Sequence, residues 1–196
     1  MGTERSAARM DEIIEVAVQL FARKGYHATT ITDISEAVGL GRGALYYYIG
    51  SKEDLLWECH NRHVDPMLDL ALELEAAAIP AREKLRALSH RLVEIIARYQ
   101  AYITVFYREM TALSPERMAE LVKKRRAFED AIERIIRQGI EAGELRQEDP
   151  RMCVLAFLGM HNWVFHWYNR QGRLQPEEIA EIFIGIFLRG MEQLDS

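Results

Sequence analysis

Cysteines, long apolar runs and strand-like alternation are all scarce in this chain of 196 residues. The cysteines Cys59 and Cys153 are too few and too far apart for a disulfide framework or a Cys-x-x-Cys metal site. The longest apolar stretch, residues 153–160, is far shorter than the roughly 20 residues of a bilayer-spanning helix. The N-terminal stretch carries charges where a secretory signal is apolar. We therefore expect a cytoplasmic protein with no membrane partner.

Motifs for catalysis are missing as well. The chain has no Gly-x-Ser-x-Gly, no phosphate-binding loop, no His-Glu-x-x-His and no Rossmann glycine run. His60 and His63 have the i, i+3 spacing that can hold a metal on a helix, with Glu58 and Asp65 nearby. This pair keeps a metal-dependent helical enzyme as a third hypothesis. The prediction is a protein without catalytic residues, cofactor or metal.

Helical patterns dominate what is present. Pro115, Pro150 and Pro176 each follow a polar residue and stand at or near an expected helix start. A proline costs nothing there, because the first N–H groups of a helix have no partner within it. Apolar residues recur at i, i+3, i+4 and i+7, the period of an amphipathic helix. The sequence therefore predicts an all-α fold of about nine helices. The expected helices are 5–24, 31–38, 42–48, 52–75, 81–100, 101–112, 115–142, 150–169 and 177–194.

The two shortest helices are separated by Gly39-Leu40-Gly41. Helices shorter than about 12 residues are marginal in water, so both must pack on the first helix. A helix, a glycine turn and a second helix form the helix-turn-helix arrangement, in which the second short helix enters the DNA major groove. We expect Gly39 to take a positive φ and Ala37 to face inward as a small residue where the helices cross. The other inward residues are expected to be Ile34, Val38, Leu40 and Leu45.

Tyr46, Tyr47 and Tyr48 follow one another in the second short helix. Consecutive helical positions point about 100° apart, so these rings cannot all face one core. At least one tyrosine hydroxyl must therefore be exposed. Such a hydroxyl, beside Lys52 at the start of the next helix, is suited to contact a DNA phosphate. Ser51 is expected to cap the next helix.

These residues resemble the DNA-binding signature of the TetR family of transcriptional regulators. The matching segments are LFARKGYHATT, Thr30-Ile31-Thr32-Asp33-Ile34, Ala37-Val38-Gly39-Leu40, Gly43-Ala44-Leu45-Tyr46-Tyr47-Tyr48 and Ser51-Lys52-Glu53-Asp54-Leu55. Gly41 departs from the family, which often has a capping Ser there, and Ile49 replaces the commoner Phe. The resemblance implies DNA contacts by Thr30, Thr32, Arg42, Gly43, Ala44, Tyr46, Tyr47 and Lys52.

The resemblance also implies an overall organisation. Residues 1–52 form a helix-turn-helix DNA-binding domain, and residues 53–196 form a ligand-binding and dimerisation domain. Residues 1–52 contain six basic and six acidic side chains, a net charge of zero. Because phosphate contacts supply most non-specific affinity, useful binding requires two copies on a palindrome. We therefore expect a homodimeric repressor that binds a double-stranded DNA operator.

The last two expected helices are too apolar for a solvent-covered surface. Two such helices from each subunit would form a four-helix bundle at a twofold axis. The alternative is that these residues are core within one subunit. The candidate dimerisation residues are Phe157, Trp167, Ile179, Phe183, Ile186 and Phe187.

Met and aromatic residues gather in the middle helices, and such residues line adaptable apolar cavities. The candidate effector-binding residues are Tyr99, Tyr102, Phe106, Met110, Leu121, Phe128, Met160 and Trp163. The segment 136–150, with Asn162-Trp163 and Trp167-Tyr168, resembles the branch of the family that responds to acyl-coenzyme A. We therefore expect the effector to be an acyl-CoA or another apolar ligand. Two alternatives stay open: a helical ligand-binding protein without operator function, and an efflux regulator that responds to hydrophobic drugs.

Overall fold

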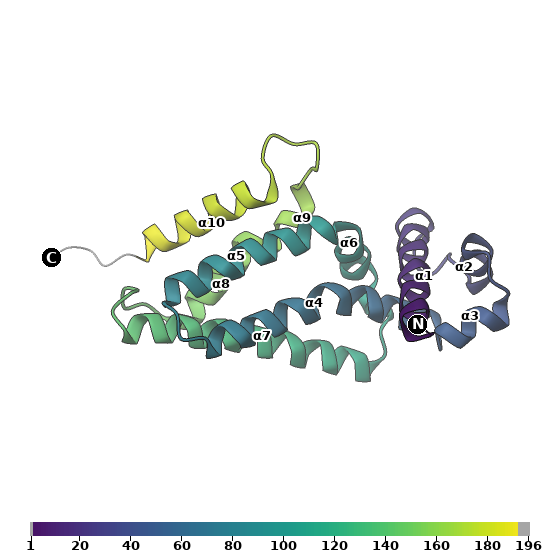
Figure 1. Cartoon of the computed structure of the whole chain (residues 1–196), viewed down its shortest axis with the longest axis horizontal. Helices are drawn as coiled ribbons and strands as arrows, with labels where there is room; N and C mark the ends of the chain where they lie inside the picture. The colour runs from purple at the N-terminus through teal and green to yellow at the C-terminus, as the bar shows by residue number, and fades with distance from the viewer. Residues whose placement is uncertain (1, 192–196) are drawn as a thin grey trace. The chain divides into compact units, whose positions relative to one another are not determined.

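The computed structural model describes residues 2–191, with side chains from Ser6 onward, and it is helical throughout (Figure 1). This confirms the predicted all-α fold. The helices are α1 (Gly2–Lys24), α2 (Ile31–Val38), α3 (Arg42–Tyr48), α4 (Lys52–Ala76), α5 (Ala81–Arg98), α6 (Gln100–Glu109), α7 (Pro115–Glu141), α8 (Pro150–Asn162), α9 (Val164–Trp167) and α10 (Pro176–Gly190), with a 3₁₀ turn η1 (Met110–Ala112).

One expected helix is interrupted. The helix predicted over 150–169 ends at Asn162, and a new short helix begins at Val164. Trp163 lies between them with φ −84° and ψ −12°. The expected last helix ends at Gly190, and the predicted residues 192–194 lie outside the described part of the chain. Within residues 2–191, no helix combines the length and apolar character that a membrane span requires.

The chain divides into two compact units. The first contains the residues up to 63 together with 101–118, and the second contains 64–100 together with the residues from 119 onward. Both α4 and α7 therefore continue from one unit into the other. The division falls inside α4 and not before it, and an independent DNA-binding domain over 1–52 stays a prediction.

Local chemistry explains where several helices begin and end. Thr30 caps α2, accepting from the Asp33 N–H while the Asp33 carboxylate accepts from the Thr30 N–H. Gly39 ends α2 with φ 71°, a left-handed conformation that glycine adopts without steric cost. Asp149 caps α8 through the Met152 N–H at 2.9 Å, and a proline follows it at the first helical position. The positive φ of Gly39 confirms the predicted glycine turn between α2 and α3.

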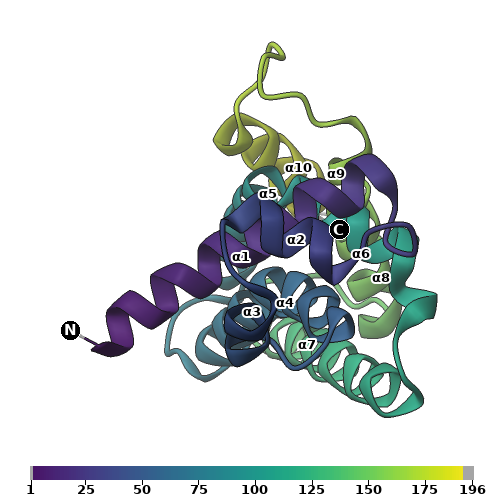
Figure 2. The same ribbon diagram turned by 90° about the vertical axis from the view of Figure 1, so that its right-hand side faces the viewer.

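The first unit is built around α1. Ile13, Ile14 and Phe21 of α1 are almost fully buried, as are Ile34 of α2 and Leu45 of α3. In Figures 1 and 2, α2 lies beside α1, and α3 follows α2 after a short turn and packs against it. The burial of these side chains holds α3 on the surface of the unit.

One inward position was predicted incorrectly. Ala37 is exposed, and Ser35 is buried instead. The Ser35 hydroxyl donates to the Thr32 carbonyl at 3.0 Å, which satisfies it without a partner on another helix. A polar residue therefore occupies the inner face of α2.

The second unit has one continuous apolar core. It includes residues from α5, α7, α8 and α10, and α5 packs along α10 (Figure 1). The largest contributors are Leu85, Leu88, Leu92, Ile132, Ile135, Ile136, Val154, Phe157, Ile184 and Phe187.

Candidate nucleic-acid interface and ligand site

The outer face of α3 stands clear of the first unit. Arg42, Gly43 and Ala44 are exposed, and Tyr47 is 83% exposed. Leu45, in the middle of the same helix, is fully buried and holds it in place. No atom lies within 4 Å of a Cβ built at Gly43, so the backbone there is open to approach. The arrangement presents a guanidinium beside two small residues, which lets a helix approach the base edges in a major groove closely.

Aromatic hydroxyls flank this face. Tyr46 is 48% exposed, and the Tyr47 and Tyr48 rings meet edge to face at 5.4 Å. Gly41 precedes α3 and provides no side-chain cap, as expected from its departure from the family pattern. The N-terminus of α3 therefore has no side-chain cap from Gly41.

The start of α2 contributes a second polar edge. Thr30 is exposed, but its hydroxyl also donates to the Asp33 carboxylate at 2.9 Å. Lys24 pairs with that carboxylate at 2.7 Å, and this hydrogen bond, together with those from Thr30, lowers the pKa of Asp33 to about 2. Thr32 is half-buried and accepts through its backbone carbonyl. Of these residues, Thr30 is the one that presents an exposed side chain.

Lys52 differs from the other DNA-binding candidates. Its Nζ donates to the Tyr26 carbonyl at 2.9 Å and to the Thr29 carbonyl at 3.0 Å. The ammonium also lies 4.4 Å from the centre of the Tyr26 ring. The ammonium is therefore engaged with the turn before α2, and a phosphate contact by Lys52 stays a prediction.

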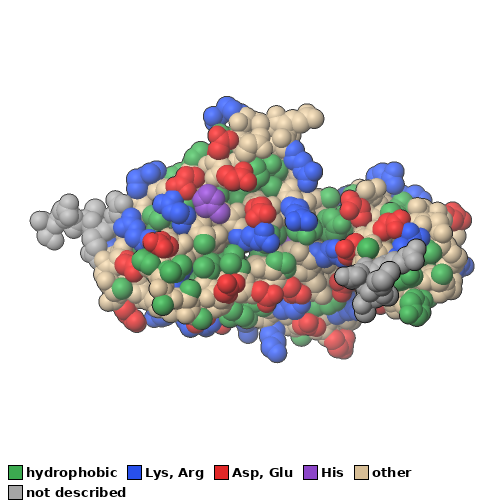
Figure 3. Space-filling model, viewed as in Figure 1, with side chains coloured by type: hydrophobic (Ala, Val, Ile, Leu, Met, Phe, Trp, Pro, Cys, Tyr) green, Lys and Arg blue, Asp and Glu red, His purple; other side chains and the backbone are tan. Residues whose placement is uncertain are grey.

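Acidic and basic side chains are interspersed over the face that Figure 3 shows. This agrees with the zero net charge of residues 1–52. Charge alone therefore gives weak attraction to a duplex, and the exposed side chains of α3 have to supply specific contacts.

The candidate effector residues are divided between the two units. Tyr102, Phe106 and Met110 belong to the first unit, and Tyr99, Leu121, Phe128, Met160 and Trp163 belong to the second. Phe106 is buried and stacks on His60 of α4 at 4.2 Å. Phe128 and Met160 pack against the core of the second unit, whereas Trp163 is 62% exposed. An effector-binding role for these residues stays a prediction.

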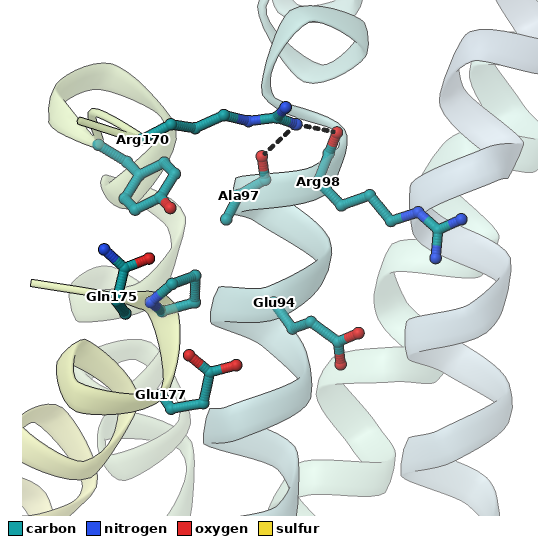
Figure 4. A pocket seen from close by; sticks show the side chains of 8 residues that line it. Glu94, Ala97, Arg98, Arg170, Gln175 and Glu177 are labelled. Carbon is teal, nitrogen blue, oxygen red and sulfur yellow. Dashed lines mark hydrogen bonds between the residues drawn. The ribbon is translucent and has the colours of Figure 1, made fainter. Parts of the chain in front are cut away.

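A cavity of about 370 Å³ lies elsewhere in the second unit, between the end of α5 and the start of α10. Arg170 reaches the carbonyls of Ala97 and Arg98 at 3.5 and 3.4 Å, while the Arg98 guanidinium points away (Figure 4). The remaining lining residues include Glu94 and Glu177, so the charges are mixed. None of the candidate effector residues lines this cavity.

The candidate dimerisation residues separate into two groups. Phe157, Ile179 and Phe187 are 0%, 3% and 7% exposed, so these three are buried within one subunit, and a dimerisation role for them stays a prediction. Trp167 and Ile186 are 46% and 53% exposed and remain available to a partner. Phe183 is half-buried.

Sequence reasoning missed other exposed apolar residues on these helices. Met152 and Leu155 of α8 are 56% and 47% exposed, and Ile182 of α10 is 45% exposed. Ile182 and Ile186 are four residues apart and so share one side of α10. Phe183 and Phe187 have the same i, i+4 spacing, so spacing alone does not identify which side of α10 is exposed.

The histidine pair on α4 packs into the first unit. His60 and His63 are each 5% exposed, and their rings lie 5.3 Å apart. His63 Nδ1 lies 3.0 Å from the Cys59 carbonyl, which can only accept, so this nitrogen carries a proton. Within the described residues no group of three or more His, Cys, Asp or Glu could hold a metal ion.

Comparisons with known proteins agree with this geometry. Residues 78–191 match the family model described as the tetracyclin repressor-like C-terminal domain, and residues 13–59 match that of bacterial regulatory proteins of the tetR family. The HTH-type transcriptional repressor KstR2 of Rhodococcus jostii is 27% identical over 191 residues, which cover 96% of this chain and 94% of that protein.

Solved structures give the same result. PfmR from Thermus thermophilus, a TetR family transcriptional regulator, superimposes with a TM-score of 0.83 at 30% identity, covering 92% of this chain and 99% of PfmR. AibR, solved with isovaleryl coenzyme A and operator DNA, superimposes with a TM-score of 0.76 at 27% identity, covering 91% of this chain and 97% of AibR.

The chain therefore belongs to the TetR family of transcriptional regulators. It is a DNA-binding transcriptional repressor of a non-enzymatic family, whose members bind operator DNA and small effectors. The expectation that it is not an enzyme is confirmed by this membership.

Proposed function

We propose that this chain binds a palindromic operator as a homodimer and leaves it when an acyl-CoA, or another apolar or amphipathic ligand, binds the C-terminal helices. The observation that carries the DNA-binding part is the outer face of α3. Arg42, Gly43, Ala44 and Tyr47 are exposed together while Leu45 is fully buried. In this proposal Arg42 reads base edges, and Tyr46, Tyr47 and Thr30 contact phosphates.

Exposed apolar side chains support the homodimer. Leu155 of α8 and Ile182 and Ile186 of α10 are each 45% exposed or more. Exposed apolar side chains that share one side of a helix, as Ile182 and Ile186 do, are typical of an interface with another chain. A second copy doubles the phosphate contacts, which compensates for the zero net charge of residues 1–52.

The effector class is supported by the likeness to AibR, which was solved with isovaleryl coenzyme A. The mechanism is a shift between two conformations. A ligand that prefers the conformation with mismatched recognition helices lowers operator affinity by its differential affinity for the two states.

The test begins with selection of duplexes from a random-sequence library by the purified full-length chain. A palindrome with half-sites about one helical turn apart is the expected product. Isovaleryl-CoA and longer acyl-CoA thioesters are then titrated against the complex, with free coenzyme A and the free carboxylic acids as controls. Release by the thioesters alone supports the effector class, and release by hydrophobic drugs alone favours an efflux regulator. Failure to enrich any sequence would refute operator binding.

A further inference from the structure

Three consecutive residues at the start of α4 form hydrogen bonds to two different segments of the chain, the turn before α2 and the start of α7. Lys52 holds the turn before α2 through the carbonyls of Tyr26 and Thr29, at 2.9 and 3.0 Å. Glu53 and Asp54, which follow it, face the start of α7 instead. All of these residues lie within the first compact unit. The first turn of α4 thus connects the helix-turn-helix, through hydrogen bonds, to the corner between α6 and α7.

The Tyr26 peptide is held from two sides. Its carbonyl accepts from Lys52 of α4, and its N–H donates to Glu109 Oε1 at the end of α6, at 3.4 Å. The Tyr26 side chain is 6% exposed and packs edge to face on Phe21 of α1 at 5.1 Å. Burial lowers the pKa of Lys52, while the Glu109 carboxylate opposes that effect. The end of α6 and the start of α4 therefore both form hydrogen bonds to the turn that leads into α2.

The acidic residues complete the link. Glu53 Oε1 accepts from the Ser114 N–H at 2.8 Å, and Arg117 Nε lies 3.7 Å from the same oxygen. Arg117 Nη2 donates to one oxygen of Asp54, and the Ser51 hydroxyl donates to the other at 2.8 Å. These bonds lower the pKa of Asp54 despite its burial. Charge-assisted bonds of this kind are roughly twice as strong as neutral ones.

We propose that this cluster, named here the α4 junction (Tyr26, Lys52, Glu53, Asp54, Glu109 and Arg117), sets the orientation of α2 and α3 for operator binding. Lys52 is then a positioning residue and not a phosphate contact. The inference rests on the proposed operator function. It assigns Arg117, which lies far along the sequence from the recognition helix, to the same task as Lys52.

The two roles of Lys52 differ in a measurable way. A phosphate contact releases a counterion, so its loss from both subunits lowers the slope of log K against log salt by about two. A positioning residue leaves that slope unchanged. Its loss lets the recognition helices adopt other spacings, so a dimer distinguishes less between operators of correct and incorrect half-site spacing.

The experiment uses the full-length dimer and the duplex selected above, with copies in which one base pair is inserted or deleted between the half-sites. Binding is measured by fluorescence anisotropy at several salt concentrations for Lys52→Gln, Arg117→Gln and Lys52→Arg. Lys123→Gln is the matched control, because it removes the same charge from an exposed residue of the second unit. Thermal unfolding of each variant checks that it is folded.

We expect Lys52→Gln and Arg117→Gln each to reduce the preference for correct spacing by about tenfold, the effect of losing a hydrogen bond to a charged group, with the salt slope unchanged. Lys52→Arg, which keeps donors for both carbonyls, restores the preference. The proposal would be overturned if Lys52→Gln lowered the salt slope by about two and kept the preference for correct spacing. It would also be overturned if Arg117→Gln left that preference unaltered. A wild-type chain that selects no duplex refutes the proposed function itself, and the junction with it.

Discussion

Ser89 and His161 share a hydrogen bond of 2.7 Å between Oγ and Nε2, and both side chains are fully buried in the second unit. His161 Nδ1 lies 2.7 Å from the Phe157 carbonyl, which can only accept, so Nδ1 carries the proton. Nε2 then accepts from the Ser89 hydroxyl. This bond connects α5 to α8 by a neutral imidazole, and burial lowers the pKa of His161 to about 4.

His161 should make the folding stability depend on pH. Its pKa is about 4 in the folded chain and about 6.5 when unfolded, so the unfolded state binds more protons between these values. The contribution of His161 to the free energy of unfolding is therefore fully present above pH 6.5 and falls as the pH drops, by about 3 kcal/mol near pH 4. Urea unfolding from pH 4.5 to 7.5 measures this. His161→Gln, which cannot titrate, should flatten that part of the profile, and an equal slope in both proteins would contradict the assignment.

Arg42→Ala should weaken operator binding and leave dimerisation intact. Loss of one specific contact to a base costs about 1–3 kcal/mol per half-site, or roughly tenfold or more in affinity. Mobility-shift titration on the selected palindrome measures the change. Arg173→Ala removes a guanidinium from an exposed position outside α3 and is the matched control. Unchanged binding by Arg42→Ala would count against α3 as the recognition helix.

Ile186→Glu should convert the dimer to monomers without unfolding the chain, because Ile186 is 53% exposed in one subunit and becomes a buried charge only in the dimer. Sedimentation velocity measures the mass, and operator affinity should fall with it. Leu72→Glu, at a position on α4 that is 43% exposed, is the control. By contrast, Phe187→Ala opens a cavity in the core and should lower stability by about 3–5 kcal/mol. A dimer that survives Ile186→Glu would place the interface elsewhere.

Trp163→Ala should impair release by the effector while operator affinity without effector is unchanged. Trp163 is 62% exposed, so its removal leaves no cavity in the core. Phe106→Ala tests the same role in the first unit, but Phe106 is 3% exposed and the change also costs stability. The readout is the acyl-CoA concentration that releases half of the DNA. An undiminished response in both variants would mean that the effector binds elsewhere.

Helix positions followed from the sequence because local rules determine them. The capping residues Thr30 and Asp149 and the prolines that start α7, α8 and α10 act within one turn of the chain. The break at Trp163 was not predictable, since the apolar periodicity continues across it and no glycine or proline marks it. Ala37 and Ser35 show the same limit, because a hydroxyl that bonds within its own helix can be buried like an apolar group.

The roles of side chains followed less well, because they depend on which neighbour each helix meets. Periodicity identified α8 and α10 as apolar on more than one side, but it could not separate Phe187, in the core, from Ile186, on the surface. Lys52 has the family pattern of a DNA contact, yet its partners Tyr26 and Thr29 lie more than 20 positions earlier in the chain. Contacts over such separations are not encoded in local spacing.

The shared helices make the recognition module hard to transplant. A fragment that stops at residue 52 would keep α1 to α3 but lose Glu109, which accepts from the Tyr26 N–H, and the first turn of α4 beyond Lys52, which bonds to Ser114 and Arg117. A chimaera that grafts only these helices onto another ligand-binding body would therefore need a compatible corner between α6 and α7 to aim them. Under the proposed roles, the side chains of α3 that contact DNA and the residues of the α4 junction that orient α3 lie in separate stretches of the chain. The two stretches therefore have to be exchanged together.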